Sequence, residues 1–154
     1  YSKGAARAII YNKKREDGPG PKKNDPGYRE QGKWLESKLS GLRGSVSRYS
    51  HESEATVTYS FLPKFSNYCL SLYRVTHQNS VSRAIVEVEQ EDVVLEEFVI
   101  DQRYPENKKG WVDLDRIEWK PKRPVKVRLK RGEGVEGALR ADALRLDSTP
   151  KACR

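Results

Sequence analysis

Side chains that commonly act as nucleophiles, general bases or metal ligands are few in this sequence. His51 and His77 are the only histidines, and neither has a second histidine or a cysteine at a spacing typical of a metal site. Cys69 and Cys153 are the only cysteines, and the sequence leaves open whether they form a disulfide. Neither a glycine-rich phosphate loop nor a Gly-x-Ser-x-Gly motif is present. We therefore expect a protein that is not an enzyme and that holds no metal and no cofactor.

Two pairs of carboxylates stand two residues apart, Glu87 with Glu89 and Asp113 with Asp115. On a strand such pairs are about 7 Å apart, a separation that overlaps the range used by inverting glycosidases. Both members of a pair point the same way, however, whereas a glycosidase places its acid and its base on opposite sides of a bond. We therefore expect solvated acidic surfaces. Calcium bound by Asp113 and Asp115 is the alternative, since hard cations take carboxylate ligands.

Basic side chains form the most regular pattern in the chain. Lys126, Arg128 and Lys130 alternate with apolar residues, so one face of this segment carries a row of cations if the segment is a strand. Further cations precede this row or lie near the start of the chain: Arg116, Lys120, Lys122, Arg123, Lys13, Lys14, Arg15, Lys22, Lys23 and Lys33. A planar guanidinium can bond a carboxylate or a sulfate through two hydrogen bonds. The row predicts a site for an anionic polymer, and charges that only keep the domain soluble are the alternative.

One aromatic residue has cationic neighbours in the sequence. Tyr73 alternates with Leu70 and Leu72 and so falls on the opposite face of its segment, next to Arg74. Sugar rings pack their C–H faces on aromatic rings while polar groups bind the hydroxyls. We expect Tyr73 and its neighbours to form a mixed aromatic and cationic platform, and a simple edge or loop surface is the alternative. The platform residues would be Tyr73, Arg74, His77 and Arg83.

The charges are distributed unevenly along the chain. Residues 1–48 hold 12 Lys and Arg against 5 Asp and Glu, residues 49–119 hold 7 against 13, and residues 120–154 hold 11 against 4. Two basic ends therefore flank an acidic middle, and the formal net charge is +8. In a sandwich whose first and last strands share a sheet, the basic ends would meet and form one positive surface.

Short alternating segments separated by Gly, Pro, Asn and Ser clusters predict strands rather than helices. The expected strands are 8–11, 55–61, 68–73, 84–89, 93–100, 111–119, 125–129 and 141–146. One candidate helix at 34–42 is interrupted by Ser40 and Gly41, and residues 13–32 predict a long basic loop. About eight strands without helices between them indicate an all-β fold, an antiparallel two-sheet β-sandwich of jelly-roll type.

The length of 154 residues fits one domain, 1–154, with its core at about 8–147. The hydrophobic share of 36% is low but adequate for one core. No apolar stretch approaches the roughly 20 residues that cross a bilayer, so we expect no membrane partner. The sequence contains no Met, which indicates a processed protein or a piece of a longer one.

Several short phrases occur in a recognisable order and spacing. They are Ile9-Ile10-Tyr11-Asn12, Asp25-Pro26-Gly27-Tyr28, Gly32-Lys33-Trp34, Gly44-Ser45, Arg48-Tyr49, Tyr68-Cys69-Leu70-Ser71-Leu72, Asp101-Gln102, Gly110-Trp111-Val112-Asp113-Leu114 and Ala141-Asp142-Ala143-Leu144-Arg145-Leu146. Together they resemble the golvesin/xanthan-lyase carbohydrate-binding-like domain family, over roughly residues 8–147. The chain differs from that family at Tyr11, where Asp is usual, and in the Lys-rich insertion after Asn12.

The resemblance implies a β-sandwich accessory module beside polysaccharide-active enzymes, hence extracellular or periplasmic (secreted) and part of a larger multidomain protein. We expect a non-catalytic carbohydrate-binding module for an acidic polysaccharide, uronate-containing or sulfated, that targets a linked enzyme to its substrate. A structural accessory domain that packs on a catalytic neighbour is the alternative. Nucleic acid is a less favoured partner, since no nucleic-acid motif accompanies the pI of about 9.5.

Three further side chains should be structural. Trp34 and Trp111 fall on recurring phrases of that family in apolar contexts, so we expect both in the core. Asp142 alternates with Leu144 and Leu146 and should point inward with them. A buried carboxyl group needs hydrogen-bonding or cationic partners there.

Overall fold

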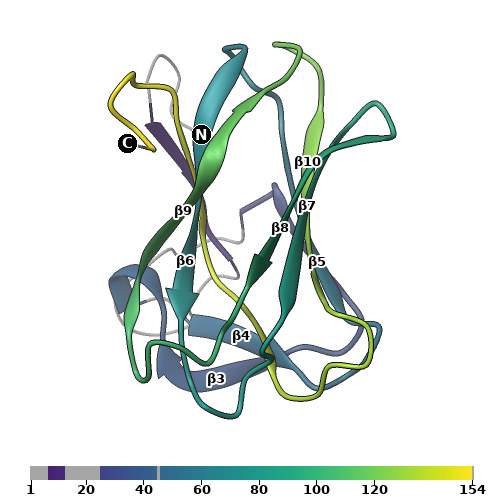
Figure 1. Cartoon of the computed structure of the whole chain (residues 1–154), viewed down its shortest axis with the longest axis vertical. Coiled ribbons are helices and arrows are strands. Elements are labelled where there is room, and N and C mark those ends of the chain that lie inside the picture. The colour runs from purple at the N-terminus through teal and green to yellow at the C-terminus, as the bar shows by residue number, and fades with distance from the viewer. Residues whose placement is uncertain (1–6, 13–24, 45, 154) are drawn as a thin grey trace.

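The computed structural model describes residues 7–12, 25–44 and 46–153. It confirms the expected all-β antiparallel sandwich, with twelve strands in those ranges rather than about eight (Figure 1). The strands are β1 (Arg7–Ile10), β2 (Tyr28–Gln31), β3 (Leu35–Ser40), β4 (Val46–Ser50), β5 (Thr56–Phe61), β6 (Asn67–Val75), β7 (Ala84–Gln90), β8 (Val93–Ile100), β9 (Lys109–Glu118), β10 (Val125–Arg131), β11 (Leu139–Ala141) and β12 (Leu144–Asp147). Among the residues described, no helix is long and apolar enough to cross a membrane.

The strands form three sheets, and every pairing between them is antiparallel. A four-stranded sheet has the order β1-β12-β6-β9, and a five-stranded sheet has the order β2-β5-β10-β7-β8. A smaller sheet, β11-β4-β3, lies across one end of the sandwich (Figure 1). The cationic row 126–130 lies on β10, so it belongs to a different sheet from β1 and β12.

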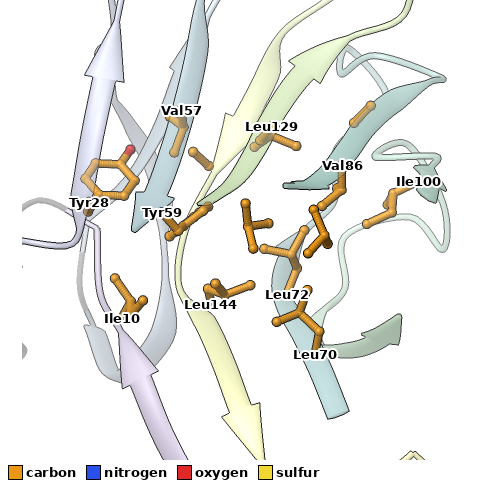
Figure 2. Close-up of a cluster of buried hydrophobic side chains, with 14 of the residues drawn as sticks. Ile10, Tyr28, Val57, Tyr59, Leu70, Leu72, Val86, Ile100, Leu129 and Leu144 are labelled. Carbon is orange, nitrogen blue, oxygen red and sulfur yellow. The ribbon is translucent and has the colours of Figure 1, made fainter. Parts of the chain in front are cut away.

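Alternation along the strands builds the core. Val57 and Tyr59 of β5 and Leu129 of β10 point from the five-stranded sheet toward Leu70 and Leu144 of the four-stranded sheet (Figure 2). Each of these side chains is at most 2% exposed. Burying a side chain of this size stabilises a fold by about 1.5–3 kcal/mol. The alternate positions on the same strands therefore face outward, and two outer sheet faces are left to display polar groups.

β2, β3 and β4 were not expected from the sequence, and the candidate helix at 34–42 was wrong. That segment forms β3 and the start of a 3₁₀ turn at Leu42–Gly44. Contacts with β4 hold it: β3 pairs with β4, and Arg48 of β4 donates to the Trp34 carbonyl oxygen at 3.2 Å. Arg48 also forms a buried ion pair with Glu30 of β2 at 2.8 Å. Trp34 is buried as expected, and its Nε1 donates to the Gln31 carbonyl oxygen at 2.9 Å.

The two end strands are neighbours. β1 pairs with β12, with Arg7 opposite Asp147, and the Arg7 guanidinium contacts the Asp147 carboxylate at 3.1 Å. Cys69 of β6 and Cys153 form a disulfide across 84 residues, a pairing that the sequence alone left open. The C-terminal turn is also held by Arg116, which donates to the Thr149 and Ala152 carbonyl oxygens at 2.6 and 3.0 Å.

Asp142 lies where the chain passes from the small sheet to the four-stranded sheet, between β11 and β12. It is 4% exposed and points inward, as expected. Its Oδ1 accepts hydrogen bonds from the backbone N–H groups of Leu42 and Ala143, at 3.3 and 2.9 Å, whereas its Oδ2 has no partner. Burial raises the pKa of this carboxyl to about 7, which the two backbone hydrogen bonds only partly oppose. Asp142 thus fixes the crossing between two sheets.

Candidate functional site

The outer face of the five-stranded sheet carries a polar strip over three adjacent strands. Because Val57 and Tyr59 of β5 point inward, Thr56, Thr58 and Ser60 point outward. Lys126 of β10 stands opposite Ser60, and Arg128 stands opposite Thr58. On the other side of β5, the β2 residues Arg29 and Gln31 pair with Thr58 and Thr56. The strand register therefore gathers cations and hydroxyl groups from distant parts of the sequence.

These side chains line a groove of about 450 Å³, called the basic groove below. Its lining residues are Pro26, Gly27, Arg29, Gln31, Thr56, Thr58, Ser60, Lys126 and Arg128. One wall is fixed closely, because the Ser60 N–H donates to the Gly27 carbonyl oxygen at 2.7 Å. A side chain at Gly27 would place its Cβ 2.6 Å from the Ser60 carbonyl oxygen, so only glycine fits there.

Among the described residues that line it, the basic groove has three cations, Arg29, Lys126 and Arg128, and no carboxylate. Neither Arg29 nor Lys126 forms an ion pair with another described residue. Arg128 contacts Glu89 of β7 at 3.4 Å and keeps about a third of its side chain exposed. The groove therefore presents positive charge to solvent.

Carboxylate side chains flank this positive strip on the side of β10 that faces away from β5. Glu87 and Glu89 lie on β7, next to β10, and their side chains reach back to Lys130 at 2.7 Å and to Arg128 at 3.4 Å. Lys130 is thus paired and does not line the groove. Among the described residues, the cationic row divides into Lys126, which forms no ion pair, Arg128, which is partly engaged by Glu89, and Lys130, which is paired with Glu87. The expected solvated acidic face at Glu87 and Glu89 is instead paired with this row.

Hydrogen bonding prepares the floor of the groove for a polar ligand. The hydroxyl groups of Thr56 and Thr58 both donate to Gln31 Oε1, at 2.8 and 3.2 Å, which orients the Gln31 amide and leaves its nitrogen as a donor. Guanidinium, ammonium, amide and hydroxyl groups at such a surface can bind carboxylate or sulfate groups together with sugar hydroxyls. Cysteine, histidine and carboxylate side chains are absent from the described residues that line the groove.

The four residues of the expected aromatic and cationic platform do not converge. Tyr73 and Arg74 line a small cavity of about 10 Å³ together with Asp142 and Arg140, in the region between the small and the four-stranded sheets. Burial, and secondarily the charge of Asp142, raises the pKa of Tyr73. The Tyr73 ring packs edge-on against Trp111 at 5.4 Å between ring centroids.

The other two platform residues lie in the loop between β6 and β7, where each makes contacts of its own. His77 Nδ1 contacts Asn79 Oδ1 at 2.7 Å, and the His77 backbone N–H donates to the Gln102 carbonyl oxygen at 3.1 Å. Arg83 is exposed and packs beside Gly132, whose N–H donates to the Arg83 carbonyl oxygen at 2.8 Å. Neither residue lines the cavity that holds Tyr73 and Arg74.

Trp111 departs from the expectation that it lies in the core. It stands opposite Tyr73 on the outer face of the four-stranded sheet and is only partly buried. The Arg145 guanidinium stacks over its ring at 4.5 Å and contacts Asp113 at 3.3 Å, while the Ser71 hydroxyl donates to Asp113 at 2.6 Å. Alternation along β9 explains the position, because Leu114 packs against the core on one side and Trp111 falls on the other. We call these four outer side chains, Ser71, Trp111, Asp113 and Arg145, the Trp111 cluster.

The calcium alternative rested on Asp113 and Asp115. Asp113 is engaged in the Trp111 cluster, and Asp115 Oδ1 accepts from the Arg116 backbone N–H at 2.7 Å. Within the described ranges, one group of three potential ligands gathers, Cys69, Asp113 and Cys153, and its two sulfur atoms are joined in the disulfide.

The sequence missed most of the basic groove. Arg29, Gln31, Thr56, Thr58 and Ser60 were not among the expected site residues, because β2 was not recognised and hydroxyl residues on a strand carry no signal by themselves. The N-terminal cations Lys13, Lys14, Arg15, Lys22 and Lys23 lie outside the described residues. The outward alternation of residues 56–60 was the one available sign of a polar strand face.

Comparisons with known proteins identify the fold. No protein-family model matches the sequence, and no curated protein matches it significantly. Among solved structures, a Paenibacillus xanthan lyase superposes with a TM-score of 0.74 at 16% identity, over 94% of this chain but 13% of the lyase. The CBM36-1 domain of a multidomain xylanase from the hindgut metagenome of Trinervitermes trinervoides gives a TM-score of 0.55 at 10% identity, over 93% of this chain and 98% of that domain.

A carbohydrate-binding module CBM36 in complex with calcium and xylotriose gives a TM-score of 0.51 at 13% identity, over 77% of this chain and 92% of the module. The chain therefore corresponds to whole carbohydrate-binding modules and to a small part of the lyase. At these identities the likeness concerns the fold. This chain has the fold of a carbohydrate-binding β-sandwich module.

Proposed function

We propose that this protein binds an acidic polysaccharide in the basic groove and catalyses no reaction itself. The observation that carries the proposal is the lining of the groove, whose described residues supply three cations with hydroxyl and amide groups and no carboxylate. Arg29 and Arg128 both pair with Thr58 on either side of β5, so their α-carbons stand about 10 Å apart, two strand spacings. A sugar chain with repeated carboxylate or sulfate groups can therefore contact more than one cation.

The fold and the disulfide support a secreted accessory module. Carbohydrate-binding modules share this fold, and the lyase in which it recurs is several times longer than this chain. A disulfide is typical of proteins in oxidising, extracellular-type compartments. We infer a single module within a larger polysaccharide-active protein, related to the golvesin/xanthan-lyase family, which would hold a linked enzyme on its substrate.

Affinity electrophoresis tests the ligand class. Pectate (a uronate polymer) and a sulfated glycan should retard the protein, whereas neutral glucans should not. The double variant Arg29→Ala/Lys126→Ala removes two contacts of about 1 kcal/mol each and should weaken retardation about 30-fold. Lys38→Ala on β3, which removes an exposed cation outside the groove, is the matched control. Equal retardation by charged and neutral polymers, or equal loss in both variants, would contradict the proposal.

Nucleic acid is also a polyanion, so a competition experiment is needed to distinguish polysaccharide binding from nucleic-acid binding. Both interactions weaken with added salt and salt dependence alone does not discriminate. Labelled pectate or sulfated glycan bound to the protein should resist a charge-matched excess of duplex DNA. Displacement by DNA at lower phosphate concentration than by the unlabelled polysaccharide would favour nucleic acid.

A second function has one specific observation in its favour. Val93, Val94 and Val99 on the edge strand β8 are 58, 48 and 55% exposed, an apolar surface that a neighbouring domain could cover. A structural accessory domain would use this edge. Val94→Ser/Val99→Ser should then weaken association with a neighbouring domain and leave polysaccharide retardation unchanged.

A further inference from the structure

The basic groove has two unlike ends. At the Thr56 end, the exposed carboxylates Glu52 and Glu54 precede β5, with Lys33 as the nearby cation whose N–H contacts Glu52. Beyond the Ser60 end lie Leu62, Lys64, Phe65 and Lys122. Glu87 and Glu89 border the groove along β7, so an anionic chain is kept over β2, β5 and β10. These charges favour a polymer that runs along β5 and leaves at the Ser60 end.

The loop beyond that end displays apolar surface. Leu62 is 56% exposed and Phe65 is 41% exposed. Leu62 continues the outward alternation of Thr58 and Ser60 and lies about 7 Å farther along the chain direction. Large apolar side chains at a loop next to a binding groove stay in unfavourable contact with water until a ligand covers them.

This loop is held rigidly, which distinguishes it from a chance exposure. The Lys122 N–H donates to the Pro63 carbonyl oxygen at 2.7 Å, and Trp119 Nε1 donates to the Phe65 carbonyl oxygen at 3.1 Å. The N–H of Phe65 donates to the Tyr68 hydroxyl at 3.2 Å, and the two rings pack at 6.0 Å between centroids. The connections β5–β6 and β9–β10 are thereby tied at one end of the sandwich (Figure 1). A side chain fixed in this way loses little conformational entropy on binding.

Cations complete the loop. Lys122 is exposed and forms no ion pair within the described part of the chain, whereas Lys120 and Arg123 are both held by Glu91 at 3.0 Å. The Lys64 ammonium lies 5.6 Å from the Phe65 ring centroid. The end of the groove therefore combines an aromatic ring and a leucine with positive charge, a combination that the groove itself lacks.

We propose that Leu62 and Phe65 form a second subsite, which packs on the sugar rings of the same acidic polysaccharide as it leaves the groove past Ser60. The inference rests on the proposed function. It adds the direction in which the polysaccharide crosses the groove and a dependence of affinity on the length of the polysaccharide. The strand from Thr56 to Ser60 spans about 13 Å, which leaves room for about three sugar units. Oligosaccharides of this length or shorter therefore contact only the groove. Longer chains reach Leu62 and Phe65.

Size-fractionated oligogalacturonides and sulfated oligosaccharides, of about three and about eight units, test the subsite by isothermal titration calorimetry. Phe65→Ala should lower the affinity for the long oligosaccharides about fivefold and for the short ones less than twofold. Leu62→Ser should act in the same direction. Arg29→Ala should weaken both lengths alike, and Val99→Ser, an exposed apolar residue on β8, should change neither. Thermal unfolding of each variant checks that Phe65→Ala remains folded, and Leu62→Ser gives a second readout if it does not.

The outcomes separate the two proposals. If the wild-type protein binds the long oligosaccharides and Phe65→Ala and Leu62→Ser reduce both lengths equally or neither, the subsite is wrong and the groove remains. If the wild-type protein binds neither the oligogalacturonides nor the sulfated oligosaccharides, both proposals are wrong. Sedimentation with anionic phospholipid vesicles that depends on Phe65, together with unchanged oligosaccharide affinity, would assign the loop to a lipid surface instead and overturn the subsite.

Discussion

The two outer sheet faces use similar side chains in opposite ways. On the four-stranded sheet, Arg145 is bonded to Asp113 and stacked on Trp111, and its side chain is 18% exposed. On the five-stranded sheet, Arg29 and Lys126 form no ion pair within the residues described and line an open groove. An arginine on a sheet face can thus be engaged by side chains of the fold itself or remain available to a ligand.

The difference lies in what stands across the strands. Ser71 of the adjacent strand β6 and Asp113 of β9, the next strand beyond, provide acceptors to Arg145, and the disulfide closes the same face. Around Arg29 and Lys126, the neighbouring strand supplies hydroxyl groups, which do not neutralise a cation. Charge that the fold leaves uncompensated marks the candidate binding surface better than charge density does.

The largest effect on stability should come from removing the disulfide on the outer face of the four-stranded sheet. Cys69→Ala/Cys153→Ala opens a loop of 84 residues, and chain entropy puts the loss of unfolding free energy at about 4–5 kcal/mol. Urea denaturation measures it, at a protein concentration where the variant is still folded. The basic groove lies on the opposite sheet, so polysaccharide retardation of the folded variant should be unchanged. Loss of retardation in a variant with native circular dichroism would show that the two faces are coupled.

Asp142, which belongs to neither face, gives the next largest effect through pH. Burial raises its pKa to about 7, whereas an unfolded aspartate titrates near 3.9, so the folded protein binds the proton more tightly. The stability that this group contributes is full below pH about 4 and is lost as pH rises through about 7, by roughly 4 kcal/mol.

Asp142→Asn cannot titrate and serves as the reference. The difference in unfolding free energy between wild type and variant, measured by urea denaturation from pH 4 to pH 8, should move in favour of the variant as pH rises. Using the difference cancels Asp147, whose pKa is lowered by hydrogen bonds from Thr149 and Arg7 despite its burial. A constant difference across this range would refute the raised pKa.

Arg145→Met sharpens the comparison between the faces. The variant keeps the aliphatic contact with Trp111 and loses the stacked charge and the bond to Asp113, which should cost about 1–2 kcal/mol of unfolding free energy. Thermal and urea unfolding measure this change. Polysaccharide affinity should stay within twofold of wild type, and a larger fall would mean that the Trp111 cluster also contacts ligand.

The smallest effect separates members of one cationic row. Lys126→Ala should weaken binding of acidic polysaccharide about fivefold, since Lys126 lines the groove and pairs with no carboxylate in the described part of the chain. Lys130→Ala should change it less than twofold, because Lys130 lies outside the groove lining and contacts Glu87 at 2.7 Å. Equal effects in quantitative affinity electrophoresis would mean that the row acts through overall charge rather than through the groove.

Alternation made much of the fold predictable from the sequence. Residues 55–61, 84–89 and 125–129 show apolar and polar positions in turn, and all three form strands of the five-stranded sheet. β2 and β3 show no such pattern. β2 has one apolar residue in four, and it is held by contacts with residues 25 and 27 positions away, the bonds from Thr56 and Thr58 to Gln31. Local pattern does not encode such contacts.

The site was predictable in part for the same reason. Lys126, Arg128 and Lys130 were expected to share one face, but their different fates depend on Glu87 and Glu89, which strand pairing brings alongside. Arg29 could not be assigned without the position of β2. The platform around Tyr73 failed to assemble because closeness in sequence places residues on the same strand and its following loop, not on one surface.

The pairing of β1 with β12 has a consequence for how such a module can be used. Arg7 stands opposite Asp147, so the first described residue lies within about 5 Å of the end of the last strand, and the Cys69–Cys153 disulfide returns the C-terminal turn to the same sheet. In a longer chain, segments that flank residues 7–153 would therefore join the same sheet, one at β1 and the other beside β6. Such a unit can be inserted into a surface loop of a host protein without a wide separation of the residues on either side.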